Sequence, residues 1–172
     1  QYQLVNNMHH SLHRAILCLI ANFSVISSGM GLAFPSISTD QLLIELSSEQ
    51  VSWFASITAI ACPFGGLLSG YVCEKFGRRG SLIFIDIIAI ISWLLLGFSN
   101  FSREFLFIQL LIARLLIGFN IGMSTTPAVM YTAEVCDPAL RGRLTMLSSP
   151  FFTATGMVMT YFLGAVVSVS RF

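Results

Sequence analysis

The fold is decided by one short charged stretch, Gly70-Tyr71-Val72-Cys73-Glu74-Lys75-Phe76-Gly77-Arg78-Arg79-Gly80, the densest charge cluster in the sequence. Long apolar runs flank it on both sides: residues 51–73 contain no Asp, Glu, Lys or Arg, and residues 81–100 contain only Asp86. Runs of this length suit helices that cross a bilayer, which need about 20 apolar residues each. Because short basic loops remain in the cytoplasm, the stretch predicts an inner turn between two membrane spans.

The composition of the whole chain is that of a membrane protein. Hydrophobic residues make up 55% of the 172 residues, charged residues only 10%, and the mean hydropathy is +0.81. A soluble domain is roughly a quarter charged, so the composition excludes a soluble surface and indicates the lipid bilayer as a partner. A net charge of +1 without a long basic run excludes nucleic-acid binding.

No pattern of catalytic or metal-ligating residues stands out. The four cysteines are scattered and have neither disulfide nor metal spacing: Cys18, Cys62, Cys73 and Cys136. A Ser-His-Asp set, a metal cluster and a phosphate-binding loop are all lacking. We therefore expect neither an enzyme nor a cofactor.

Five apolar runs have the length of a membrane span. A polar segment covers residues 1–14, and the expected helices cover about 15–37, 51–73, 81–98, 105–133 and 144–170. Outer connectors in this scheme hold two basic residues, Arg103 and Arg171, and the inner segments hold six, Arg14, Lys75, Arg78, Arg79, Arg141 and Arg143. This bias predicts a cytoplasmic N-terminus.

Paired glycines predict where helices approach each other closely. Gly66 and Gly70 form a small-xxx-small pair in the second span, and Gly118 and Gly122 have the same spacing in the fourth. Such pairs allow the backbone of another helix to come near.

Two mixed-sign clusters fall on the predicted inner face. Glu74 would lie at the C-terminal end of its helix, where the helix dipole disfavours a carboxylate by about 0.3–1 kcal/mol, so it needs a cation. Glu134 and Arg141 form a second acid-then-arginine turn. Ion pairs between the clusters, made in one state and broken in another, would form a latch; the alternative is that the basic residues only set the topology.

The charged turns resemble the signatures of a known family. Gly70-x-x-x-Glu74-Lys75-x-Gly77-Arg78-Arg79 resembles the loop signature of the major facilitator superfamily. Arg114-x-x-x-Gly118-x-x-x-Gly122, followed by Tyr131-x-x-Glu134 and Arg141-Gly142, resembles its sugar porter branch. Within that branch the chain is most similar to insect facilitated trehalose transporters, through Gly29-Met30, Phe34-Pro35 and Ser52-Trp53.

The resemblance implies an all-α membrane protein that contains the first five transmembrane helices of a major facilitator fold. That fold has two six-helix halves with the substrate site between them, so the chain would lack the C-terminal half and be either a partial sequence or a truncated product. The implied function is a facilitative hexose or trehalose-like carrier in the plasma membrane, working by alternating access. Its inner gate would be closed by ion pairs among Glu74, Arg78, Arg79, Glu134 and Arg141.

Two ionisable residues fall inside the predicted spans. Arg114 would lie roughly 15 Å deep at 1.5 Å per residue, where an unpaired cation costs on the order of 3 kcal/mol or more, so we expect it to face the bundle interior. In proton-coupled sugar porters the matching arginine works with an aspartate of the first helix, but residues 15–37 contain no acid. This favours passive transport over proton symport. Asp86 is either a hydrogen-bonded acid or a proton relay.

The sugar contacts are less clear. The fifth helix of the family usually presents a glutamine to the sugar, and residues 144–170 contain none. Ser149 and Thr153 are the candidates that remain. An alternative function is a truncated membrane protein that does not transport and instead binds or regulates a partner carrier.

Overall fold

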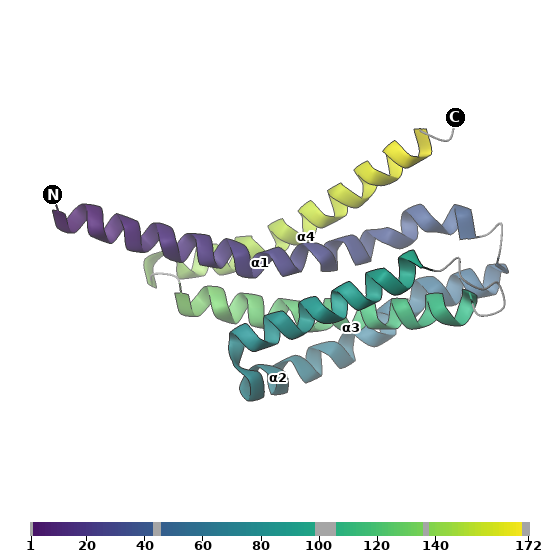
Figure 1. Ribbon diagram of the computed structural model, residues 1–172, viewed down its shortest axis with the longest axis horizontal. Coiled ribbons are helices and arrows are strands. Elements are labelled where there is room, and N and C mark those ends of the chain that lie inside the picture. Colours follow the sequence, from purple (N-terminus) through teal and green to yellow (C-terminus); the bar gives the residue numbers. More distant parts are fainter. Residues whose placement is uncertain (1, 43–45, 99–105, 136–137, 170–172) are drawn as a thin grey trace.

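The computed structural model describes residues 2–42, 46–98, 106–135 and 138–169, and their regular structure is helical throughout. The helices are α1 (Tyr2–Leu42), α2 (Ser48–Gly97), α3 (Leu106–Val135) and α4 (Pro138–Val169). They form an elongated bundle in which α3 packs most extensively on α2, and α1 packs on α4 (Figure 1). Contacts between α1 and α3 join the two pairs.

Helix α2 contains two spans. It is 50 residues long, about twice the length that a bilayer needs, and it folds back on itself at Gly77 (Figure 1). Gly77 has φ = 71° and ψ = 170°, a conformation that is essentially restricted to glycine. The first arm, residues 48–76, begins with a capping box between Ser47 and Gln50. The second arm covers residues 78–97, so the charged stretch of the sequence forms the bend.

The ends of the other helices differ from the sequence-based limits. Helix α1 begins at Tyr2 and ends at Leu42, so residues 2–14 of the polar segment continue the helix of the first span. Helix α4 begins at Pro138, before the expected start at residue 144. Two of the expected limits, residues 105 and 170, lie outside the described residues, as do Arg103, Cys136 and Arg171.

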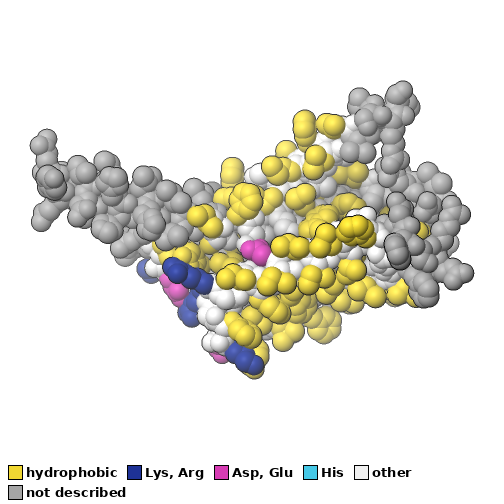
Figure 2. Space-filling view, in the orientation of Figure 1, with side chains coloured by type: hydrophobic (Ala, Val, Ile, Leu, Met, Phe, Trp, Pro, Cys, Tyr) yellow, Lys and Arg dark blue, Asp and Glu magenta, His cyan; other side chains and the backbone are white. Residues whose placement is uncertain are grey.

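The described part of the chain has the surface of a membrane protein. Three of its helical segments are long and apolar enough to cross a membrane: Ile20–Thr39, Ser48–Gly97 and Leu106–Val135. Large apolar side chains are exposed, with Leu67 at 80% and Phe23 at 68%. Figure 2 shows hydrophobic side chains over much of the described part of one face, with an acidic side chain among them, while the other visible charged side chains gather at the end where α2 bends. This separation is what lipid on the sides and water at one end require.

Glycines hold α2 and α3 at backbone contact. A Cβ at Gly122 would overlap the carbonyl oxygen of Cys62, and one at Gly118 would overlap that of Thr58. The matching glycine of α2 is Gly65, where a Cβ would overlap the carbonyl oxygen of Phe119. Of the predicted pair, Gly66 lies at this contact through its backbone nitrogen, which is 2.8 Å from a Cβ at Gly122, whereas nothing lies within 4 Å of a Cβ at Gly70.

A second glycine contact joins α1 and α4. A Cβ at Gly29 would overlap the carbonyl oxygen of Thr153, and one at Gly156 would overlap that of Ile26. Each helix thus contributes one glycine to the place where the other passes. This contact brings the first and last described helices side by side, although most of the chain separates them.

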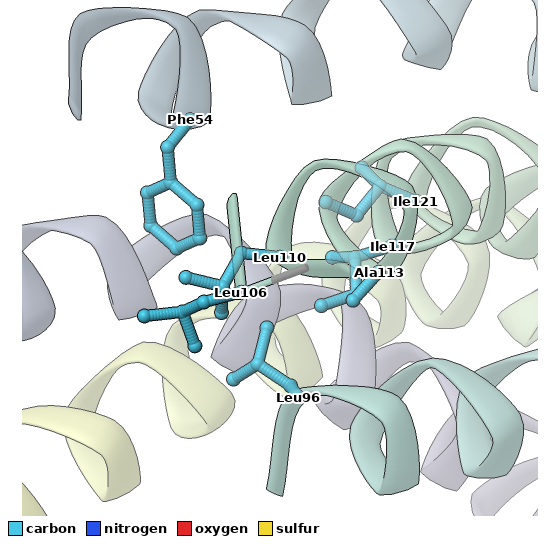
Figure 3. Packing of buried hydrophobic residues seen from close by; sticks show 7 residues of the cluster. All are labelled: Phe54, Leu96, Leu106, Leu110, Ala113, Ile117 and Ile121. Carbon is cyan, nitrogen blue, oxygen red and sulfur yellow. The ribbon is translucent and has the colours of Figure 1, made fainter. Parts of the chain in front are cut away.

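The main apolar cluster fills the space between α3 and the two arms of α2. Figure 3 shows Phe54 from the first arm and Leu96 from the second lying on either side of the α3 residues Leu106 and Leu110. The α3 residues Ala113, Ile117 and Ile121 continue the cluster. It therefore ties both arms of α2 to one helix.

Candidate functional site

One ion pair joins the two charged clusters at the bent end of α2. Arg78 is the first residue after the bend, and Glu134 lies next to the last residue of α3. The Arg78 Nη2 atom lies 2.7 Å from Glu134 Oε1, and the two side chains are 44% and 50% exposed. Exposed pairs of this kind contribute only about 0–1 kcal/mol, so this contact can break and re-form at little cost.

The other members of the predicted network lie apart from this pair. Within the described residues, Glu74, Arg79 and Arg141 are exposed and make no ion pair. A Cβ at any of the signature glycines, Gly70, Gly77 and Gly142, would meet open space. The structure thus brings together two of the five charged residues that the sequence grouped.

Arg114 is completely buried among aromatic rings. Its guanidinium carbon lies 4.6 Å from the ring centre of Phe54 and 5.7 Å from that of Phe34. The Nη1 atom donates a hydrogen bond to the carbonyl oxygen of Gly31 at 3.0 Å. The Nε and Nη2 atoms are buried and have no hydrogen-bond partner among the described residues. Arg114 therefore faces the interior, where α1, the first arm of α2, and α3 meet.

A cavity of about 390 Å³ adjoins Arg114. It lies between α1, which contributes Gly31 and Pro35, and the first arm of α2, which contributes Ala59 and Cys62. Most of its lining is apolar.

A network of uncharged polar side chains links α1 to α3. The Ser28 hydroxyl lies 2.7 Å from that of Ser124 and donates to Asn120 Oδ1 at 3.4 Å. Asn120 Nδ2 donates to the carbonyl oxygen of Ile85 at 2.8 Å, which adds the second arm of α2. A further bond runs from Asn22 Nδ2 to the Thr132 hydroxyl at 2.9 Å. The sequence analysis missed these residues, and the available signal was the polar spacing Asn120, Ser124 and Thr132 within an apolar span.

Asp86 borders a second, larger groove. This groove of about 1160 Å³ lies between α1, the second arm of α2, and Phe152 of α4. Asp86 interacts with the hydroxyl of Ser24, and Trp93 Nε1 donates to the Ser27 hydroxyl at 3.0 Å. Asp86 is half-buried, and most of the groove lining around it is apolar.

Of the two candidate sugar contacts, Thr153 lies at the contact between α4 and α1. Thr153 donates its hydroxyl to the carbonyl oxygen of Ser149 at 2.9 Å, and its own backbone packs on Gly29. Neither residue borders either of the two cavities.

Comparisons with known proteins give the family. The profile of the family described as "Sugar (and other) transporter" matches residues 9–171. The chain is 37% identical over 111 residues to human solute carrier family 2, facilitated glucose transporter member 5; the match covers 62% of this chain and 22% of that protein. It is 32% identical over 122 residues to sugar transporter ERD6-like 6 of Arabidopsis thaliana, covering 71% of this chain and 24% of that protein. The chain thus matches under a quarter of the length of these relatives.

The fold is similar to that of a solved transporter. The inward-open xylose transporter XylE from E. coli matches with a TM-score of 0.76 and 23% sequence identity, over 90% of this chain and 40% of that one. The relatives are named as transporters, which confirms the prediction that the chain is not an enzyme. The chain belongs to the sugar (and other) transporter family, and its helices form the first five transmembrane helices of a major facilitator fold.

Proposed function

We propose that the chain forms part of a facilitative sugar carrier that works by alternating access. The observation that carries the proposal is the family match, which extends over residues 9–171. Its relatives include proteins named as facilitated glucose transporters. Hexoses are the first substrate candidates. Trehalose is another, because Phe34-Pro35 and Ser52-Trp53 resemble the sequence of insect facilitated trehalose transporters.

The transport unit includes a second helical bundle, the C-terminal half of the carrier. Substrate sites in this fold lie between two such bundles, and the matched part of each relative is under a quarter of its length. The placement of Thr153 at the contact with α1, and its hydrogen bond to Ser149, favour a structural role for both residues. The sugar is then held mainly by other groups, from both bundles.

The surroundings of Arg114 support transport without proton coupling. Its hydrogen-bond acceptor on α1 is the Gly31 carbonyl oxygen, which does not take up a proton at ordinary pH. No carboxylate in the described residues pairs with it. Asp86, the acid within the second arm of α2, borders a different cavity from that of Arg114.

The Arg78–Glu134 pair acts as part of the inner gate. It joins the bend of α2 to the end of α3 across a distance of 2.7 Å, and its partial exposure allows it to open. Glu74, Arg79 and Arg141 are also exposed and make no ion pair within the described residues, so they are available to pair with charges on the second bundle.

Uptake by the full-length carrier in proteoliposomes tests the function. We expect saturable counterflow of radiolabelled glucose, fructose or trehalose, unchanged when a protonophore collapses the proton gradient. Empty liposomes, and liposomes given mannitol as the labelled solute, are the controls. Failure of every sugar would contradict the transport proposal, and a requirement for the proton gradient would contradict the facilitative mechanism alone.

The carrier lies in the plasma membrane with its N-terminus in the cytoplasm. The excess of basic residues in the inner segments supports this orientation. We expect an epitope tag at the N-terminus to bind antibody only in permeabilised cells, and a tag inserted at residues 99–104 to bind it on intact cells. The reverse result would invert the whole topology.

A further inference from the structure

We propose that Arg114 is a positioning residue: it supplies α1 with the hydrogen-bond donor that Pro35 lacks, and it thereby sets the direction of the C-terminal segment of α1, residues 35–42. The proposal depends neither on the transported substrate nor on proton coupling. It is carried by the observed hydrogen bond of the guanidinium and by the place in α1 where that bond ends.

The first step is the break in the backbone hydrogen bonds of α1. Pro35 lies inside this helix, four residues after Gly31. In an α-helix each carbonyl oxygen accepts from the backbone N–H four residues later, but proline has no N–H. The Gly31 carbonyl oxygen therefore lacks its usual donor. Gly31 is buried, and a buried carbonyl without a partner costs about as much free energy as a lost hydrogen bond.

The second step is that Arg114 provides a donor from another helix. Its Nη1 atom donates to the Gly31 carbonyl oxygen at 3.0 Å. Gly31 also allows the close approach, because a Cβ there would lie 2.6 Å from Cγ2 of Ile117 on α3. The ring of Phe34, the residue before the proline, has its centre 5.7 Å from the guanidinium carbon. These contacts hold the guanidinium at the break.

The third step is a comparison with the other prolines that lie inside helices. The carbonyl oxygens four residues before Pro63, Pro127 and Pro150 belong to Ala59, Met123 and Met146. Within the described residues none of these three oxygens accepts a side-chain hydrogen bond. The bond from Arg114 is thus particular to the break at Pro35 and is not a general property of prolines in this bundle.

The consequence is a link between α3 and the direction in which α1 ends. A proline inside a helix kinks it. The Thr39 hydroxyl donates to the carbonyl oxygen of Pro35 at 2.6 Å, and threonine bonds of this kind often bend helices as well. With the bond from Arg114 in place, α3 holds this loosened turn. Without that bond, residues 35–42 turn more freely about Pro35.

Solid-state NMR of the full chain in liposomes observes the bond directly. Glycine labelled with ¹³C at the carbonyl and leucine labelled with ¹⁵N select the Gly-Leu pairs, which are Gly31-Leu32 and Gly66-Leu67 in this sequence. Leu32→Ile removes the first signal and so assigns it. We expect the Gly31 carbonyl signal to move upfield in Arg114→Met and to keep its position in Arg114→Lys, which retains a charged donor. An unchanged signal in folded Arg114→Met would overturn the proposal.

A double-mutant cycle separates this role from other effects of the buried cation. Pro35→Ala restores a backbone N–H to the Gly31 carbonyl oxygen, so the loss of the guanidinium should then matter less. We expect Arg114→Met to lower the folding equilibrium constant in detergent about tenfold more in the unmodified chain than in Pro35→Ala, equivalent to ~1.4 kcal/mol of coupling. Purely additive effects of the two substitutions would overturn the proposal.

Pro150→Ala is the matched control, because it replaces an exposed proline of α4 whose break has no side-chain donor within the described residues. It should leave the effect of Arg114→Met unchanged. If Arg114→Met does not fold by itself, recovery of the folded chain by Pro35→Ala but not by Pro150→Ala supports the proposal. Recovery by neither, or equally by both, would contradict it.

Discussion

Replacing Gly122 by alanine should lower the free energy of unfolding of the bundle by about 1–3 kcal/mol, the usual cost of overpacking. The added Cβ would overlap the carbonyl oxygen of Cys62 and lie 2.8 Å from the backbone nitrogen of Gly66. Both atoms belong to the backbone of a helix, so neither can turn aside as a side-chain end would. Relief requires α2 and α3 to separate along their whole contact.

Gly70→Ala is the matched control. Gly70 lies in the first arm of α2, and nothing stands within 4 Å of its added Cβ. There the higher helix propensity of alanine should dominate and raise stability by up to about 1 kcal/mol. Tryptophan fluorescence during denaturation in detergent measures both, since Trp53 and Trp93 lie on the two arms of α2. Equal stabilities for the two variants would refute the backbone contact at Gly122.

Reversing one charge of the inner pair should slow sugar exchange, and reversing both should restore it. Arg78→Glu places two carboxylates where the structure has a 2.7 Å ion pair, and their repulsion opens the contact. We expect exchange in proteoliposomes of the full-length carrier to fall by about tenfold, equivalent to ~1.4 kcal/mol. The double variant Arg78→Glu/Glu134→Arg rebuilds the pair with its polarity reversed and should recover most of the rate.

Arg143→Glu controls for a general change of charge. It lies exposed on α4 and makes no ion pair within the described residues, so its reversal should leave exchange unchanged. Maleimide labelling of Cys73 gives a readout that does not need transport. Cys73 is only 3% exposed before the bend, and it should react faster in the single variant than in the double one. Loss of exchange in both, without faster labelling in the single one, would argue against the pair as a gate.

Much of the fold could be predicted from the sequence because a membrane span is recognised by the summed hydropathy of a run of residues, whatever their exact order. Two long apolar runs around a charged turn leave few arrangements, and the glycine at the bend, Gly77, is where the chain reverses. The interior position expected of Arg114 agrees with its complete burial. Such inferences need only the length of a run and the energy of a charge in lipid, and neither depends on fine geometry.

Details of packing did not follow, because they depend on the rotation of each helix. Gly65 and Gly66 are neighbours in sequence but point about 100° apart on a helix with 3.6 residues per turn, so a motif rule could not tell that the position closed to a side chain is Gly65 rather than Gly66 or Gly70. The pairing of Arg78, rather than Arg79, with Glu134 depends on the same kind of angle. Hydrogen bonds of Ser28, Asn120 and Ser124 connect positions far apart in the sequence, and no local pattern gives such partners.

The glycine contacts also determine which parts of the molecule are able to shift. Where one backbone rests directly on another, at Gly122 against Cys62 and at Gly156 against Ile26, there is no layer of side chains to rearrange. The pair α2–α3 and the pair α1–α4 should each move as a rigid body, here called a block. Internal adjustment is then left to the Ser28, Asn120 and Ser124 layer between the blocks, whose hydroxyl and amide groups can exchange partners as one block turns against the other.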